Sequence, residues 1–76
     1  MKTLYIVDRT ARQYPFLIDQ LYLIHGKTRK EFTGNDESLK FLYDLIGGGM
    51  CFMLVQGENK SIFRGETLIG ANITQN

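Results

Sequence analysis

The segment 39–70 constrains the fold of this chain more than any other part of its sequence. Residues 39–46 carry apolar side chains at helical spacing, and three successive glycines, 47–49, follow them as a helix stop. The run Met-Cys-Phe-Met-Leu-Val at 50–55 is apolar throughout, which is typical of a strand buried on both faces. Four residues, 57–60, then turn the chain into a second strand, 61–64. The segment predicts a helix, a strand and a hairpin around one core.

Composition limits the kind of protein this sequence can form. Seventy-six residues predict a single domain, 1–76, near the smallest size at which a hydrophobic core suffices. With 43% hydrophobic and 22% charged residues, the chain is expected to fold rather than stay disordered. The single cysteine, Cys51, excludes an internal disulfide and an all-cysteine zinc site. Because it lies in the most apolar run, we expect it to be a buried, inert thiol.

The sequence contains no pattern that indicates catalysis, a cofactor or a metal. One histidine, His25, and one cysteine give no spacing typical of metal ligands. The glycines at 47–49 follow a helix and precede a strand, the reverse of the order in phosphate-binding loops. We therefore expect no enzyme activity, no cofactor and no metal, and we interpret His25 as a cap or core residue. The start of the chain lacks a signal peptide pattern and no apolar run could span a bilayer, which predicts a cytoplasmic protein without membrane contact.

The first third of the chain predicts a strand followed by a helix. Residues 3–7 have the aromatic and β-branched content of a strand, and 8–13 form a polar loop. Pro15 can open a helix, and apolar residues at helical spacing continue to position 24 before His25 and Gly26 end it. Phe16 and Leu23, however, project away from this stripe, so the helix would be apolar nearly all round. Either these two side chains contact a partner, or residues 16–24 form a strand.

The remaining elements complete the predicted fold. Residues 28–32 suit a short, charged edge strand. Asn35 is a candidate helix N-cap, with Asp36 and Glu37 in the first turn. The tail, 65–76, fits either a continued strand or a short terminal helix. The order is β-α-β-α-β-β, which predicts an α/β domain with a mixed sheet of three to four strands packed with two helices.

This order and two local motifs resemble the thioredoxin-like proteins, in particular the glutaredoxins. Tyr14-Pro15-Phe16-Leu17 is similar to the Cys-Pro-Tyr-Cys motif of that family, with both cysteines replaced. Residues 62–71 look like its terminal strand and the Ile-Gly-Gly turn that helps to hold glutathione. The Thr-Val-Pro motif of the family is absent, because Pro15 is the only proline. The resemblance implies a degenerate domain that cannot carry out thiol–disulfide exchange, since that reaction needs a thiolate.

Charge is unevenly distributed along the chain. Residues 1–30 carry six basic and two acidic side chains, whereas residues 31–76 carry three basic and six acidic ones. The basic residues include Arg12, Arg29 and Lys30, which could contact phosphates, and tyrosines 5, 14 and 22 could stack on bases. The net charge is only +1, and the basic cluster is short. We therefore interpret it as a solvated edge, with nucleic acid as the less favoured ligand.

These observations favour a non-catalytic module that binds protein. The predicted contact residues are Phe16 and Leu23, as surplus apolar surface, with Arg12, Arg29 and Lys30 beside them. The partner would be a larger protein or a second copy of this chain. Proteins of this size commonly act as adaptors or as inhibitors, including those that phages make against host factors. Two alternatives stay open: a nucleic-acid-binding protein that uses its basic loops, and a degenerate glutaredoxin-like domain that retains a ligand site.

Overall fold

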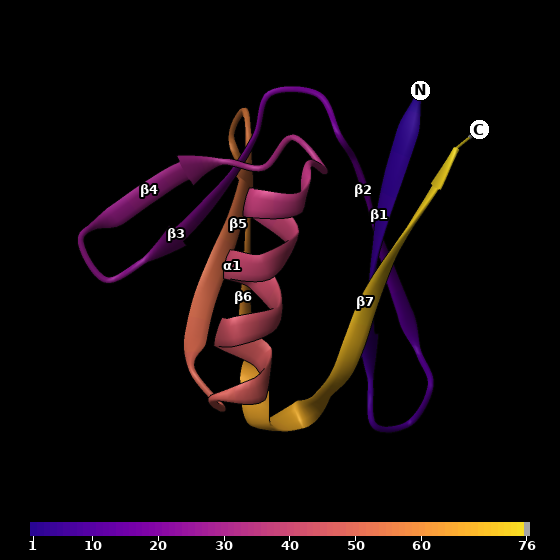
Figure 1. The fold of residues 1–76 in the computed structure, drawn as a ribbon, viewed down its shortest axis with the longest axis vertical. Helices are drawn as coiled ribbons and strands as arrows, with labels where there is room; N and C mark the ends of the chain where they lie inside the picture. The colour runs from indigo at the N-terminus through magenta and orange to yellow at the C-terminus, as the bar shows by residue number, and fades with distance from the viewer. Residues whose placement is uncertain (76) are drawn as a thin grey trace.

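The computed structural model describes residues 1–75 and consists mostly of β-sheet. One helix, α1 (Asp36–Gly47), and a short 3-10 turn, η1 (Gly65–Thr67), accompany seven strands. The strands are β1 (Lys2–Asp8), β2 (Gln13–Leu17), β3 (Leu21–His25), β4 (Thr28–Glu31), β5 (Cys51–Gln56), β6 (Asn59–Arg64) and β7 (Leu68–Gln75). They form two antiparallel sheets, a three-stranded one in the order β2-β1-β7 and a four-stranded one in the order β4-β3-β5-β6 (Figure 1).

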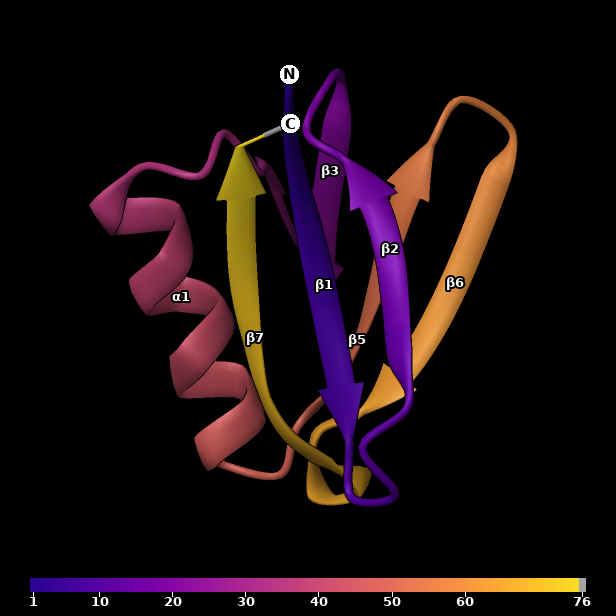
Figure 2. The same ribbon diagram turned by 90° about the vertical axis from the view of Figure 1, so that its right-hand side faces the viewer.

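The two sheets face each other, and α1 packs along one of the two open sides between them (Figures 1 and 2). This side is bordered by β7, which α1 contacts together with η1. On the opposite side the edge strands β2 and β6 face each other across the space between the sheets without pairing, and we call this side the seam. Aromatic rings close it from within, because Tyr14 and Phe16 of β2 contact Phe63 of β6 with ring centroids 5.6 and 5.8 Å apart.

The core lies between the sheets and the helix. Alternate residues of each strand point inward, as the period of two in a strand requires. The fully buried apolar side chains come from both sheets, from α1 and from the segment that follows β4: Leu4, Ile6, Leu21, Leu23, Phe32, Leu42 and Leu54. Phe52, Leu45 and Leu68 complete this core.

The predicted α/β fold with two helices and a mixed sheet is wrong. The segment expected to form the first helix, 14–24, instead forms β2, a turn and β3, and the chain passes from one sheet to the other within it. Tyr14 and Phe16 point inward from the first sheet, and Leu21 and Leu23 from the second. The turn between them places Gln20 at a φ of 50°, a left-handed conformation that ends any regular periodicity. The apolar residues of β2 and β3, read together along the sequence, therefore have a spacing that resembles that of one amphipathic helix.

The expectation for β5 was also partly wrong. Its apolar run is not buried on both faces: Phe52 and Leu54 are buried, whereas the alternate residues Cys51, Met53 and Val55 face outward. Cys51, expected to be a buried thiol, is exposed. The tail follows the strand alternative, since η1 leads into β7, which pairs with β1.

Several predicted elements are confirmed. The first strand corresponds to β1, and the charged segment after position 27 forms the edge strand β4. The Asn35 side chain caps α1 by accepting a hydrogen bond of 2.8 Å from the backbone N–H of Ser38. The helix ends at the glycines, as predicted, and Gly49 adopts a φ of 69°. The hairpin between β5 and β6 is present, but its turn has two residues instead of the four expected at 57–60, and Gly57 has a φ of 60° at its first position. Within the residues described, no helix is long and apolar enough to span a membrane.

Candidate partner-binding surface

The outer face of the four-stranded sheet, which points away from the core, carries a continuous apolar strip. Tyr22 and Ile24 of β3 lie beside Val55 and Met53 of β5, and Met53 lies opposite Ile62 of β6. Four of these side chains are half-buried, and Ile62 is 76% exposed. We call these five residues the outer strip. Large exposed apolar areas on small proteins commonly mark interaction sites.

Charged side chains border the outer strip on both sides. On β4, Arg29 lies opposite Ile24, and its guanidinium carbon is 4.4 Å from the centroid of the Tyr22 ring. Glu31 is the acidic neighbour on the same strand. On β6, Lys60 makes no ion pair with the residues described, whereas Arg64 pairs with Glu66. The strip therefore has an apolar centre and a polar rim, the arrangement found in protein interfaces.

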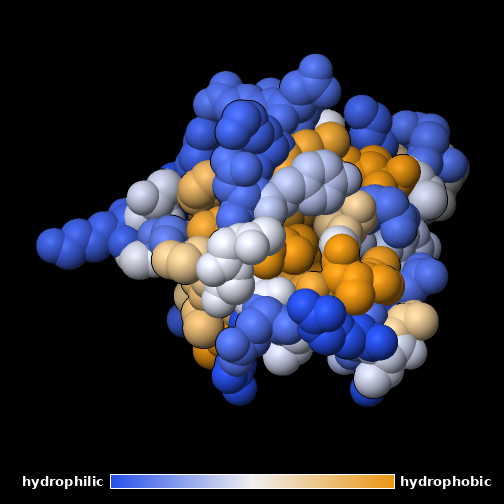
Figure 3. All heavy atoms as spheres, turned by 60° about the horizontal axis from the view of Figure 1, so that its bottom comes forward, coloured by the Kyte–Doolittle hydropathy of each residue, from blue (hydrophilic) through white to orange (hydrophobic). Residues whose placement is uncertain are grey.

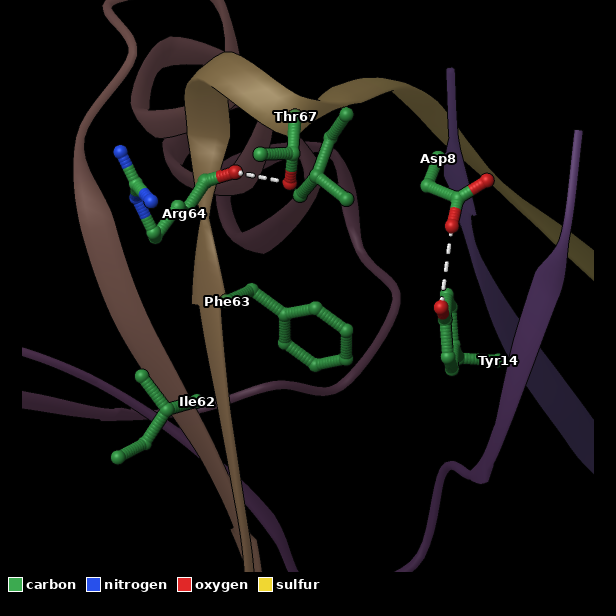
Figure 4. Close-up of a pocket in the computed structure, with 7 residues that line it drawn as sticks. Asp8, Tyr14, Ile62, Phe63, Arg64 and Thr67 are labelled. Carbon is green, nitrogen blue, oxygen red and sulfur yellow. Dashed lines mark hydrogen bonds between the residues drawn. The ribbon is translucent and has the colours of Figure 1, made fainter. Parts of the chain in front are cut away.

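A cleft of about 260 Å³ opens beside this strip, at the end of the seam near η1. Its apolar lining comes from Tyr14, Ile62, Phe63 and Leu68, and its polar lining from Asp8, Arg64 and Thr67. Figure 4 shows that Phe63 points from β6 towards Tyr14, whereas Ile62 points to the other side of the strand. Ile62 lies at the border of the two features: it lines the cleft and also forms one end of the outer strip. Viewed from this end of the molecule, hydrophobic side chains occupy the middle of the surface within a hydrophilic rim (Figure 3).

Asp8 organises the loop at the edge of the cleft. One carboxylate oxygen, Oδ1, accepts hydrogen bonds from the hydroxyl and the backbone N–H of Thr10 and from the backbone N–H of Arg12. The other, Oδ2, accepts from the hydroxyl of Tyr14 at 3.0 Å (Figure 4). The Thr10 hydroxyl has the largest effect on the pKa of Asp8, and these donors together lower it despite partial desolvation. The pKa of Tyr14 is raised, because its hydroxyl donates to this carboxylate.

This network gives Asp8 a structural role in the loop. Its two oxygens accept four hydrogen bonds from groups of the loop and of Tyr14, three of them on Oδ1 and one on Oδ2. The same loop is tied to η1, since the backbone N–H of Arg9 donates to the carbonyl of Thr67 and the Arg9 side chain donates to the carbonyl of Glu66. Hydrogen bonds between the loop that follows β1 and η1 therefore hold the two sides of the cleft together.

The residues predicted as partner contacts lie in different places. Leu23 is 1% exposed and belongs to the core, so it does not form the surplus apolar surface expected of it. Phe16 is half-buried and packs on Phe63, in the other sheet from Leu23. The Lys30 ammonium pairs with Glu37 at 2.8 Å and lies 5.5 Å from the Phe41 ring, and this pairing lowers the pKa of Glu37.

Both predicted arginines, Arg12 and Arg29, lie beside the surface described above. Arg29 borders the outer strip, and the guanidinium of Arg12 lies 5.1 Å from the ring of Tyr14, which lines the cleft. The outer strip itself was missed. Its signal was present as alternation in 21–25, but in β5 both faces are apolar, so the exposed half of that strand could not be distinguished from the buried half.

The histidine and the segment that resembles a redox motif have structural surroundings of their own. Among the residues that the structure describes, no group of three or more histidine, cysteine, aspartate or glutamate side chains is arranged to hold a metal ion. The Nδ1 atom of His25 lies 3.0 Å from the carbonyl oxygen of Cys51, a contact that ties β3 to the start of β5. The segment that resembles the Cys-Pro-Tyr-Cys motif forms the edge strand β2 rather than the start of a helix.

No protein-family model matches this chain, and no match is found among the curated proteins or the solved structures.

Proposed function

We propose that this protein is a non-catalytic module that binds another protein through the outer strip and the adjoining cleft. The observation that supports the proposal is the apolar strip across three strands, ending at Ile62, which is 76% exposed. Covering such a strip removes apolar area from water, at about 25 cal/mol per Å². A tyrosine beside an arginine, as at Tyr22 and Arg29, is also a pair of the residue types that dominate binding energy in interfaces.

The same surface is less suited to nucleic acid. Binding to single strands relies on a basic groove and on several aromatic rings against which bases can stack. The outer strip has one ring, that of Tyr22, and the Arg29 guanidinium already lies over it. Glu31 lies opposite Tyr22 in the neighbouring strand, where its charge would repel a phosphate. These features favour a protein partner.

The test compares two surface variants with the parent protein in capture from cells of the source organism. Met53→Lys puts a charge in the middle of the outer strip, and we expect it to weaken capture of a specific partner at least tenfold. Leu17→Lys is the matched control, because Leu17 is 48% exposed and lies on β2 in the other sheet. It should capture the partner as the parent does.

Thermal melts of both variants establish that they are folded. Equal capture by the parent and by Met53→Lys would contradict the proposed use of the outer strip. Capture of RNA or DNA that nuclease treatment abolishes would instead support the nucleic-acid alternative.

A further inference from the structure

We infer that the partner contributes an extended segment of alternating acidic and apolar residues, which pairs with the free edge of β6 and adds a fifth strand to the four-stranded sheet. This inference rests on the proposed function and names the kind of segment that would bind. It follows from a comparison of the four sheet edges, from the direction of the β6 backbone groups and from the side chains around them.

Three of the four sheet edges are protected against strand pairing. The β4 edge is only four residues long, and a very short edge strand offers few backbone groups for pairing. The β2 edge has Pro15 at its centre, and proline offers no N–H to a further strand. The β7 edge lies next to α1, whose Tyr43 hydroxyl donates to the carbonyl of Ala71. The fourth edge, β6, is six residues long and contains no proline.

The register of the hairpin determines which β6 groups point outward. A two-residue turn makes the flanking pair, Gln56 and Asn59, the first hydrogen-bonded pair of the ladder. Hydrogen-bonded pairs then alternate, so the N–H and C=O groups of Lys60, Ile62 and Arg64 point away from β5. The hydroxyl of Thr67 donates to the Arg64 carbonyl at 2.8 Å, as this direction requires (Figure 4). The groups of Lys60 and Ile62 are left to pair with an added strand.

The side chains along β6 define the chemistry of the added segment. Its inward-pointing residues would enter the cleft between Tyr14, Phe63 and Leu68, where apolar side chains fit. Its outward-pointing residues would lie opposite Lys60, Ile62 and Arg64, of which Lys60 makes no ion pair with the residues described and Arg64 already pairs with Glu66. Opposite charges in directly facing positions stabilise a pair of strands and like charges destabilise it, so Lys60 favours glutamate or aspartate at the position that faces it.

The test uses a capped synthetic peptide of eight residues in which glutamate alternates with valine or leucine. Binding is followed by amide NMR of the unmodified protein. We expect the peptide to shift the amide signals of Lys60 and Ile62 most strongly and to slow the hydrogen exchange of the Ile62 amide at least tenfold. A peptide with lysine in place of glutamate should bind at least tenfold more weakly.

Backbone pairing is separated from side-chain attraction by N-methylation. Two further peptides keep every side chain but carry methyl groups on alternate amides, on one edge of the strand or on the other. The version whose methyl groups face β6 should lose at least tenfold in affinity, and the other should retain most of it. Equal affinity for the two versions would overturn the inference.

Variants of the protein provide a second, independent test of strand pairing at β6. Ile62→Pro removes one outward N–H without removing a hydrogen bond to β5, and Ile62→Val is its matched control. We expect at least tenfold weaker peptide binding for the first and nearly unchanged binding for the second. Should Ile62→Pro fail to fold, the N-methylated peptides still decide the question on the unmodified protein.

Other occupants give distinct results. A dimer of the protein alone in sedimentation, lost in Ile62→Pro, would mean that a second copy occupies this edge, and would overturn the inference. Peptide-induced shifts confined to Tyr22, Ile24 and Met53, without protection of the Ile62 amide, would also overturn it while leaving the proposed function intact. Capture that does not respond to Met53→Lys would count against the proposed function itself.

Discussion

Burial at single positions separates the residues that hold this fold from those available to a partner. Leu23 and Ile24 are adjacent in sequence, yet the first is in the core and the second is on the outer strip. A strand reverses the direction of successive side chains, so adjacent residues experience different surroundings. This is why the expected contact residue Leu23 is a core residue and its neighbour is the better candidate.

Truncating Leu23 should therefore destabilise the protein rather than impair binding alone. We expect Leu23→Ala to lower the free energy of unfolding by about 2–5 kcal/mol, because it leaves a cavity between the sheets. Leu17→Ala, at a position 48% exposed, should change it by less than about 0.5 kcal/mol. Denaturant titration of both variants measures the difference. Equal stability of the two would show that Leu23 does not pack as described.

Asp8 makes the stability depend on pH in the acid range. Its pKa in the folded protein is lowered, so its contribution is present above the ordinary aspartate pKa of about 4 and is lost as the pH falls through the folded value. Asp8→Asn should lower the melting temperature at pH 7 and flatten its decline below about pH 4. Melting curves at a series of pH values test this. An unchanged acid decline in the variant would mean that other carboxylates account for it.

At the level of elements, the sequence predicts α1, its caps and the following hairpin well, because each depends on local chemistry. Asn35 as a cap and glycine at the helix end and in the turn are local signals. The segment 14–24 could not be assigned in this way. The break at Gln20 contains neither glycine nor proline, so no local signal marks it. The segment forms two strands instead of one helix because β2 pairs in one sheet and β3 in the other, and the sequence does not show this pairing. The outer strip depends on the same information, so it could not be predicted either.

The alternation along β6 predicts which of its amides exchange slowly with solvent. Amides of Ser61 and Phe63 donate to β5, so they should be protected, whereas those of Lys60 and Ile62 should exchange at least tenfold faster in the free protein. Hydrogen exchange followed by NMR measures each amide separately. Protection of the Ile62 amide in the isolated monomer would show that this edge is already covered.

At the level of the whole molecule, the helix and the two sheets are connected by a close backbone contact at Gly65. A Cβ atom there would be 2.8 Å from the carbonyl oxygens of Leu45 and Met50, which are backbone atoms that cannot rotate away. The end of α1, the start of β5 and η1 meet at this point. Only glycine allows these backbone segments to come so close. The contact therefore determines the path of the chain from β6 through η1 into β7 of the other sheet.

Gly65→Ala should therefore destabilise the whole fold, by about 1–3 kcal/mol as an overpacked site. Gly70→Ala is a matched control, because a Cβ at Gly70 meets no atom within 4 Å. It should be neutral or slightly stabilising. Thermal unfolding of the two variants gives the comparison. An unchanged melting temperature of Gly65→Ala would show that the backbone around Gly65 can move apart without loss of stability.

The pairing of β1 with β7 also determines how the molecule responds to mechanical tension. The two strands are antiparallel, with Lys2 opposite Gln75, so the start of β1 and the end of β7 lie at the same end of the molecule (Figure 1). A force applied through the two ends would load the hydrogen bonds of this ladder one after another, like a zipper, instead of shearing them together. The protein should yield at low force when pulled by its ends, and peeling β7 away would uncover β1 at the centre of its sheet.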